Sequence, residues 1–211
     1  MRESRKPPSF MKSEAPRIAI SSGLLYIKMM YWFEKWIIWI YRWRHCRGFG
    51  VQSPSDYSFI RYVINEHYPY YAYAELMDRL GDIGKLKRKK AELLFRIANW
   101  IQSPSIALLI KDDNYHIYMH EGCRSSIIRN QYDGDKYVIV SSFDKDECLF
   151  LMNNMRDGCL LVIDDLNNWK ARQLWKKIVA DERATITFDL YYLGIVMVVD
   201  KRYKINYKVN F

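Results

Sequence analysis

The sequence predicts an α/β protein in which helices first precede the strands of a sheet and then alternate with them. From residue 106 onward, short runs rich in Ile, Val, Leu and Tyr alternate with helical stretches, and most of the runs are bounded by Gly, Asp or Asn. The runs are nearly continuous in apolar residues, which is typical of strands covered by helices on both faces of a sheet. Half of the 211 residues are hydrophobic and 27% are charged, as in soluble globular proteins.

Each element follows from these patterns. We expect a disordered leader at 1–22, a helical region at 23–102 and the sheet at 103–211, the last two forming one domain. The strands are expected at 106–110, 115–120, 137–141, 160–163, 185–188 and 195–199. The helices are expected at 24–46, 53–66 with Ser53 as N-cap, 72–80, 85–102, 145–155 and 167–180. The final segment, 202–211, alternates polar and apolar residues, which predicts an edge strand with one face in solvent.

The positive charge of the chain is concentrated at its N-terminal end. Ten Lys and Arg stand against three Glu up to residue 50, so seven of the nine net charges lie there. Such a basic arm is either solvated or touches an acidic lipid surface or nucleic acid. No nucleic-acid-binding motif accompanies it, so we do not expect nucleic acid as a partner.

The expected helix at 24–46 is unusually aromatic. Lys28, Lys35 and Arg42 are seven residues apart and share one stripe, while Trp, Ile, Met and Tyr occupy the rest of the circumference. Its longest uncharged run, 36–41, is far too short to cross a bilayer. We expect this helix to dock on its own domain, to pair with a second copy in a homodimer, or to lie at a membrane interface. The four cysteines show no metal-ligand spacing and suit reduced thiols in a cytoplasmic protein.

Ligands of open α/β sheets bind beyond the carboxyl ends of the strands, so acidic residues there are candidate site residues. The pair Asp164 and Asp165 is the most informative, because adjacent carboxylates repel each other unless a cation, an amide donor or water compensates them. A divalent metal is one compensation, and capping of the next helix by Asp165 or Asn167 is another. The lysine-rich run at 85–90 opens a helix, where the dipole disfavours cations, so we expect a solvated surface or an anion contact.

The segment "GCLLVIDDLNNWKARQLWKKIVADERATITFDLYYLGIVMV" resembles the C-terminal third of bacterial class I S-adenosylmethionine-dependent methyltransferases of the O-methyltransferase type. Upstream, "GFGVQSPSDYSF" is similar to the His-Gly-x-His-Ser-Pro-Phe element of that group, with Phe49 and Gln52 in place of the two histidines. The matching residues of the C-terminal segment are Gly158, Asp164, Asp165, Trp175, Ile178, Thr185, Thr187, Asp189, Leu190, Gly194 and Val196.

The resemblance implies a Rossmann-like methyltransferase sheet closed by an antiparallel C-terminal hairpin, with S-adenosylmethionine as cofactor and a small molecule as methyl acceptor. Glu121 matches the acid that binds the cofactor ribose, and Asp112 lies in the loop expected to contact the cofactor. Asp164 and Asp165 match the catalytic pair, which holds a divalent metal or orients the acceptor hydroxyl.

Two departures from the group concern cofactor binding. The first strand is followed by "LLIKDDNYHIYM", which has no glycine and no expected helix before the second strand, and glycines allow the closest backbone approach to a ligand. The fourth strand of the group ends in Asp, whereas this chain has Ser141 and Ser142. We therefore expect a methyltransferase-like protein that is degenerate in cofactor binding. The alternative is a non-catalytic binding or scaffold protein, attached peripherally to a membrane through 24–46.

Overall fold

The computed structural model describes residues 50–134, 137–140 and 144–211, with Phe33, Trp36, Ile37, Ile40 and Arg42 before them. Met1–Tyr41 and Arg42–Phe211 form two compact units, and all the elements named below belong to the second. The expected leader at 1–22, and most of the helix expected at 24–46, lie outside the described residues. Those described at 33, 36, 37, 40 and 42 are helical.

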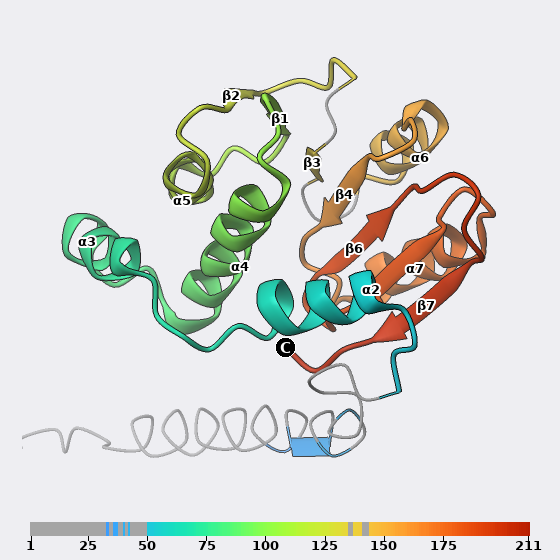
Figure 1. The fold of residues 1–211 in the computed structure, drawn as a ribbon, viewed down its shortest axis with the longest axis horizontal. Helices are drawn as coiled ribbons and strands as arrows, with labels where there is room; N and C mark the ends of the chain where they lie inside the picture. Colours follow the sequence, from blue (N-terminus) through green and yellow to red (C-terminus); the bar gives the residue numbers. More distant parts are fainter. Residues whose placement is uncertain are drawn as a thin grey trace, which may run out of the picture. The chain divides into compact units, whose positions relative to one another are not determined.

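A mixed seven-stranded sheet forms the centre of the second unit, in the order β2-β1-β3-β4-β6-β5-β7 (Figure 1). The first four strands run parallel, β6 runs antiparallel to both β4 and β5, and β7 runs parallel to β5. The strands are β1 (Ser105–Leu108), β2 (Ile127–Arg129), β3 (Tyr137–Val140), β4 (Leu160–Ile163), β5 (Ile186–Asp189), β6 (Gly194–Met197) and β7 (Ile205–Lys208).

Helices cover both faces of this sheet. Neighbouring residues of a strand point to opposite sides, so each central strand contributes apolar side chains to both faces. Leu160 and Val162 of β4 face a core built with the helices that precede β2, whereas Leu161 and Ile163 face a second core under α6 and α7. The helices are α2 (Pro54–Phe59), the π-helix η2 (Ile60–Ile64), α3 (Tyr71–Leu80), α4 (Lys85–Ile101), α5 (Asp113–Gly122), α6 (Lys145–Asn154) and α7 (Trp169–Ala180). The α/β class is therefore confirmed, while its assignment to a Rossmann-like methyltransferase sheet stays a prediction.

The strand expected at 115–120 is wrong, because these residues belong to helix α5. Asp112 caps this helix by accepting hydrogen bonds from the backbone N–H groups of Asn114 and Tyr115. The buried residues are Tyr115, Tyr118, Met119 and Gly122, and their spacing of three and four is that of one helix face. The crossover helix that the sequence seemed to lack is thus present, between β1 and β2.

Strand β2 was missed because it offers little pattern. It has three residues, lies at the edge of the sheet and leaves Ile127 exposed. The edge strand expected near the C-terminus is confirmed as β7, whose residues alternate between partly buried and exposed side chains.

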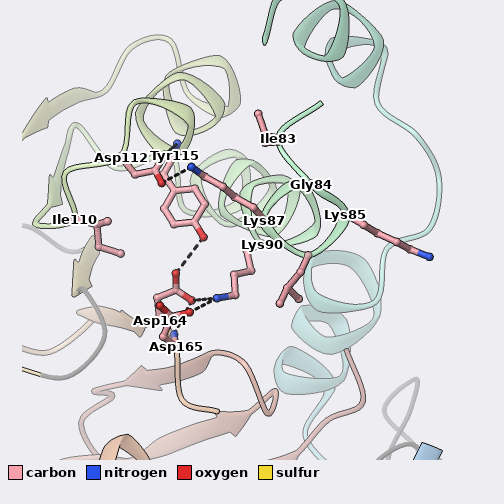
Figure 2. A pocket seen from close by; sticks show the side chains of 11 residues that line it. Ile83, Gly84, Lys85, Lys87, Lys90, Ile110, Asp112, Tyr115, Asp164 and Asp165 are labelled. Carbon is pink, nitrogen blue, oxygen red and sulfur yellow. Dashed lines mark hydrogen bonds and ion pairs between the residues drawn. The ribbon is translucent and has the colours of Figure 1, made fainter. Parts of the chain in front are cut away.

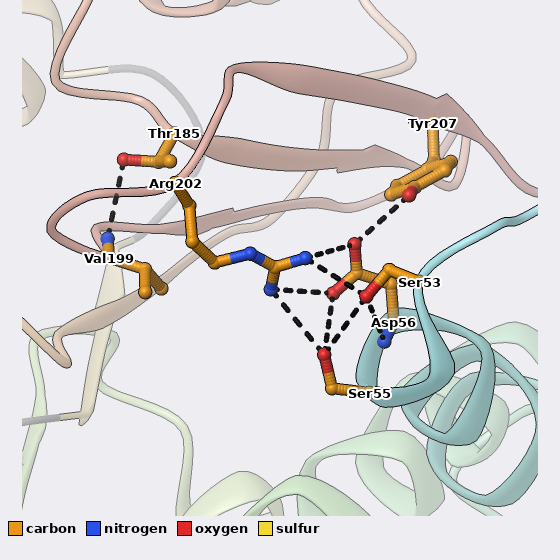
Figure 3. A network of polar contacts seen from close by, with 7 residues as sticks. All are labelled: Ser53, Ser55, Asp56, Thr185, Val199, Arg202 and Tyr207. Atoms are coloured by element: carbon orange, nitrogen blue, oxygen red, sulfur yellow. Dashed lines mark hydrogen bonds and ion pairs between the residues drawn. The ribbon is translucent and has the colours of Figure 1, made fainter.

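A polar network joins the start of α2 to the C-terminal part of the chain (Figure 3). The buried carboxylate of Asp56 accepts two hydrogen bonds from the guanidinium of Arg202, at 2.9 and 3.0 Å, and one from the hydroxyl of Tyr207 at 2.9 Å. Ser53, which caps α2 as expected, accepts from Nη2 of Arg202, one of the two nitrogens that also donate to Asp56. Because Arg202 and Tyr207 lie just before and within β7, this network fixes α2 against the edge of the sheet.

Candidate functional site

A pocket of about 570 Å³ lies where three elements of the second unit meet (Figure 2). It is formed by the first turns of α4, the loop from β1 into α5, and the residues that follow β4. The carboxyl ends of β1 and β4 both lie at this pocket, and ligands of open α/β sheets bind beyond the carboxyl ends of the strands. The residues that line it are Ile83, Gly84, Lys85, Leu86, Lys87, Lys90, Ile110, Asp112, Tyr115, Asp164 and Asp165.

Lys90 and Asp164 form a buried ion pair at the base of this pocket. The ammonium Nζ lies 2.6 Å from Asp164 Oδ1, and the residues expose only 5% and 6% of their surface. Burial lowers the pKa of Lys90, but the carboxylates of Asp164 and Asp165 outweigh it and hold that pKa above its usual value. Burial raises the pKa of Asp164, and the Lys90 charge only partly opposes this shift. The ammonium and the carboxylates thus favour each other's charged forms, while burial opposes the charge on both residues.

Two further donors complete the environment of Asp164. The hydroxyl of Tyr115 donates to Oδ2 at 3.0 Å, and the backbone N–H of Asp165 donates to Oδ1 at 2.7 Å. Burial and the neighbouring Asp164 carboxylate hold the pKa of Tyr115 well above its usual range, so the phenol keeps its proton. Both oxygens of Asp164 are consequently occupied by donors from the protein itself.

Asp165 is the more accessible member of the pair. Its carboxylate is half exposed, and Oδ1 lies 2.5 Å from Lys90 Nζ. Its backbone has φ +54°, a left-handed conformation that Asp tolerates better than most residues. Asn168 caps α7 by accepting from the N–H of Ala171, so the expectation that Asp165 or Asn167 caps this helix is wrong.

The lysines of α4 are not a purely solvated surface, as one of our two readings had it. Lys85, Lys87 and Lys90 all line the pocket, and Lys87 forms an ion pair of 2.7 Å with Asp112, the N-cap of α5. Carboxylates across the pocket thus account for cations at the end of a helix where the dipole disfavours them. The expected anion contact of the run at 85–90 singled out neither Lys87 nor Lys90, and Tyr115 was not a candidate, since only the fold brings these residues to the carboxylates.

Three of the four predicted site residues meet in this pocket, namely Asp112, Asp164 and Asp165. Glu121 does not, because it lies on the last turn of α5, where it forms ion pairs with Arg124 and Arg79. Its expected contact with a cofactor ribose depended on a strand at 115–120, so that argument loses its basis.

The other acidic residues that follow strands have structural partners. Asp144 caps α6. Asp189 forms ion pairs with Arg42 at 2.9 Å and Arg172 at 2.7 Å. Burial opposes the charge of Asp189, but the two guanidinium groups outweigh it and hold its pKa below the usual value. The serines expected at the end of β3 lie outside the described residues.

A divalent metal fits this pocket poorly. Within the part of the chain that the structure describes, no three His, Cys, Asp or Glu side chains gather in a way that could hold a metal ion. The two carboxylates expected to bind it share the Lys90 ammonium instead. An ion between their Oδ1 atoms would need distances of about 2.0–2.6 Å, which are those that Nζ already occupies.

Comparisons with known proteins add no assignment. No protein-family model matches the chain, and no curated protein sequence matches it. Among the described residues, no helix combines the length and the hydropathy needed to cross a membrane.

Proposed function

We propose that this protein is an S-adenosylmethionine-dependent methyltransferase-like protein of the O-methyltransferase type that binds a small ligand but is degenerate in catalysis. One observation carries the proposal: the loop after β1 and the acidic pair after β4, the two regions that the resemblance implicates, line the same pocket. The expected Rossmann-like sheet is supported by the β1–α5–β2 crossover and by the antiparallel β5–β6 hairpin beside β4.

The interactions of Asp164 argue against catalysis by this carboxylate. Transfer of a methyl group to a hydroxyl requires that the hydroxyl lose its proton to a base. Asp164 is bonded through both oxygens to Lys90, Tyr115 and the N–H of Asp165, and these three donors stabilise the carboxylate and so weaken it as a base. Asp165 keeps one carboxylate oxygen that accepts no hydrogen bond from the described residues, so it is suited to orient a ligand hydroxyl.

The loop after β1 argues against tight cofactor binding. Residues 109–112 are Leu, Ile, Lys and Asp, and without glycine their side chains keep a ligand further from the backbone. At the start of α5, the side chain of Asp112 already accepts from the N–H groups of Asn114 and Tyr115, so these two donors are engaged within the protein. We therefore propose weak binding of S-adenosylmethionine and no methyl transfer.

Calorimetry with S-adenosylmethionine and with its demethylated product tests this proposal. We expect binding in the micromolar to millimolar range that Asp112→Asn weakens by about tenfold, equivalent to about 1.4 kcal/mol. Glu121→Gln, at the other end of α5, is the matched control and should leave the affinity unchanged. If only Glu121→Gln lowered the affinity, Glu121 would be the residue that contacts the cofactor ribose. The absence of any binding heat with the folded protein at millimolar ligand would overturn the proposal.

A second candidate function, peripheral membrane attachment, is favoured by one observation on the first unit. Phe33, Trp36, Ile37 and Ile40 are exposed, and their spacing of three and four places them on one helix face. An exposed apolar stripe with Trp, within a strongly basic N-terminal region, suits an anionic lipid surface.

Co-sedimentation of the full chain with vesicles tests this attachment. We expect pelleting with vesicles that contain phosphatidylglycerol, and loss of pelleting in Trp36→Glu. Trp169→Glu is the matched control, because Trp169 is also exposed, at 74% against 50% for Trp36, but belongs to α7. Equal pelleting of both variants would contradict a membrane role. So would analytical ultracentrifugation that shows a dimer in the absence of lipid, if Trp36→Glu dissociates that dimer.

A further inference from the structure

The adjacent carboxylates at the end of β4 repel each other, and the fold has to compensate this repulsion. Asp164 is almost fully buried, and its neighbour Asp165 is half exposed. Two negative charges so close to each other, one of them desolvated, need a positive charge within a few ångströms. Metal-binding proteins solve this problem with a divalent cation.

We propose that Lys90 is the resident cation of this pocket, so that the protein binds its ligand without a metal ion and the Lys90 ammonium excludes one. The inference concerns the same pocket as the proposed function and rests on it for the identity of the ligand. The role of Lys90 rests on geometry alone.

The geometry of Lys90 is that of a bridging cation. Its Nζ lies 2.6 Å from Asp164 Oδ1 and 2.5 Å from Asp165 Oδ1, so one ammonium contacts both carboxylates (Figure 2). These distances leave no volume between the two oxygens for a second cation, and the positive charge would repel one.

The position of Lys90 in the fold makes this arrangement rigid. Lys90 lies on α4 next to Ala91 and one turn before Leu94, and both of these residues are buried in the core. The side chain exposes only 6% of its surface, so its stem is packed in the protein while its ammonium lines the pocket.

An ammonium also differs from a metal in what it offers a ligand. It has three N–H donors, and two of them are directed at described acceptors. The third donor, together with the second oxygen of Asp165, gives the pocket one donor and one acceptor for a polar group. Since Lys90 and Asp165 line the pocket together with Lys87 and Asp112, a ligand meets these two groups among its polar contacts.

The test removes the ammonium and asks whether a divalent cation replaces it. We expect the wild-type melting temperature to be unaffected by millimolar MnCl₂ or by a chelator. Lys90→Met should gain Mn²⁺ binding by calorimetry together with a rise in melting temperature, and Lys90→Met/Asp165→Asn should lose both. Lys87→Met, which removes the other paired lysine of the pocket, is the matched control and should gain nothing.

Two outcomes would overturn the proposal. One is Mn²⁺ binding to the wild-type protein that Asp165→Asn abolishes, because the site would then accommodate a metal beside Lys90. The other is a folded Lys90→Met that gains no Mn²⁺ binding. If Lys90→Met does not fold in chelator, refolding on addition of Mn²⁺ supports the proposal, and failure to refold with Mn²⁺ contradicts it. None of these measurements contains S-adenosylmethionine, so their failure is separate from failure of the proposed function.

Discussion

The ammonium of Lys90, on the helix before β1, lies 2.6 Å from the carboxylate of Asp164, at the end of β4. The two residues are 74 positions apart in the printed sequence and both are buried. This ion pair connects the helical N-terminal part of the second unit to the acidic edge of its sheet, and it places a positive charge beside the carboxylates of the pocket.

Loss of the Lys90 charge should destabilise the fold in a pH-dependent way. Removing one partner of a buried pair costs about 3–5 kcal/mol, because the other charge stays buried without compensation. In Lys90→Met the pKa of Asp164 should rise further, so the folded state binds more protons than the unfolded state above about pH 4. Stability of this variant, measured by urea unfolding in chelator, should therefore fall as the pH rises above about 4. A pH-independent loss would contradict this assignment.

Asp189 should stabilise the protein at neutral pH and cease to do so in acid. Because Arg42 and Arg172 hold its pKa below the usual value, its contribution is complete above the unfolded pKa of about 3.9 and disappears as the pH falls through the folded pKa. Asp189→Asn should cost about 1–3 kcal/mol at pH 7, and the difference from wild type should shrink below pH 4. Asp133→Asn, which removes an exposed ion pair with Arg129, should cost less than about 0.5 kcal/mol.

The hydroxyl of Tyr137 should destabilise the folded protein. It is fully buried at the start of β3 and, among the described residues, is the one buried side-chain polar atom without a hydrogen-bond partner. Tyr137→Phe should raise the free energy of unfolding by about 1 kcal/mol. The same change at Tyr73 should lower it by about as much, because that hydroxyl donates to the carbonyl of Glu92 and accepts from Arg96. Destabilisation by Tyr137→Phe would indicate a partner for this hydroxyl.

Gly194 should not tolerate a side chain. An added Cβ would lie 2.4 Å from the ring of Trp175 and 2.6 Å from Leu166 Cδ1, so Gly194→Ala should cost about 1–3 kcal/mol. Trp175→Leu should relieve part of this loss, and the double variant should lose less than the sum of the two single variants in thermal unfolding. Strict additivity would show that the ring is not the obstacle.

Gly122 provides a control for the double-variant comparison of Gly194→Ala and Trp175→Leu. A Cβ there would lie 2.4 Å from the backbone oxygen of Phe95, where α5 approaches α4. Because the obstacle is backbone, Phe95→Ala should not relieve Gly122→Ala.

Much of the architecture could be predicted because its elements carry local signals. The buried strand β4, the capped helix α2 and the alternating edge strand β7 each have a pattern that depends on their own side chains. The sequence predicted a strand at 115–120 where α5 lies, because a short run of Tyr, Ile and Met fits either a strand or one face of a helix. Only burial of Tyr115, Tyr118 and Met119 on one side decides between them.

The sequence by itself determined that this is an α/β protein, and it placed Asp112, Asp164 and Asp165 at the carboxyl ends of strands. Adjacency of Asp164 and Asp165 also required some compensation of charge, because their repulsion does not depend on the fold. Which group compensates them was decided by tertiary structure alone, since Lys90 reaches them only when α4 packs beside β1 and β4. Helix packing thus turned a lysine that looked like part of a solvated run into the cation of the site.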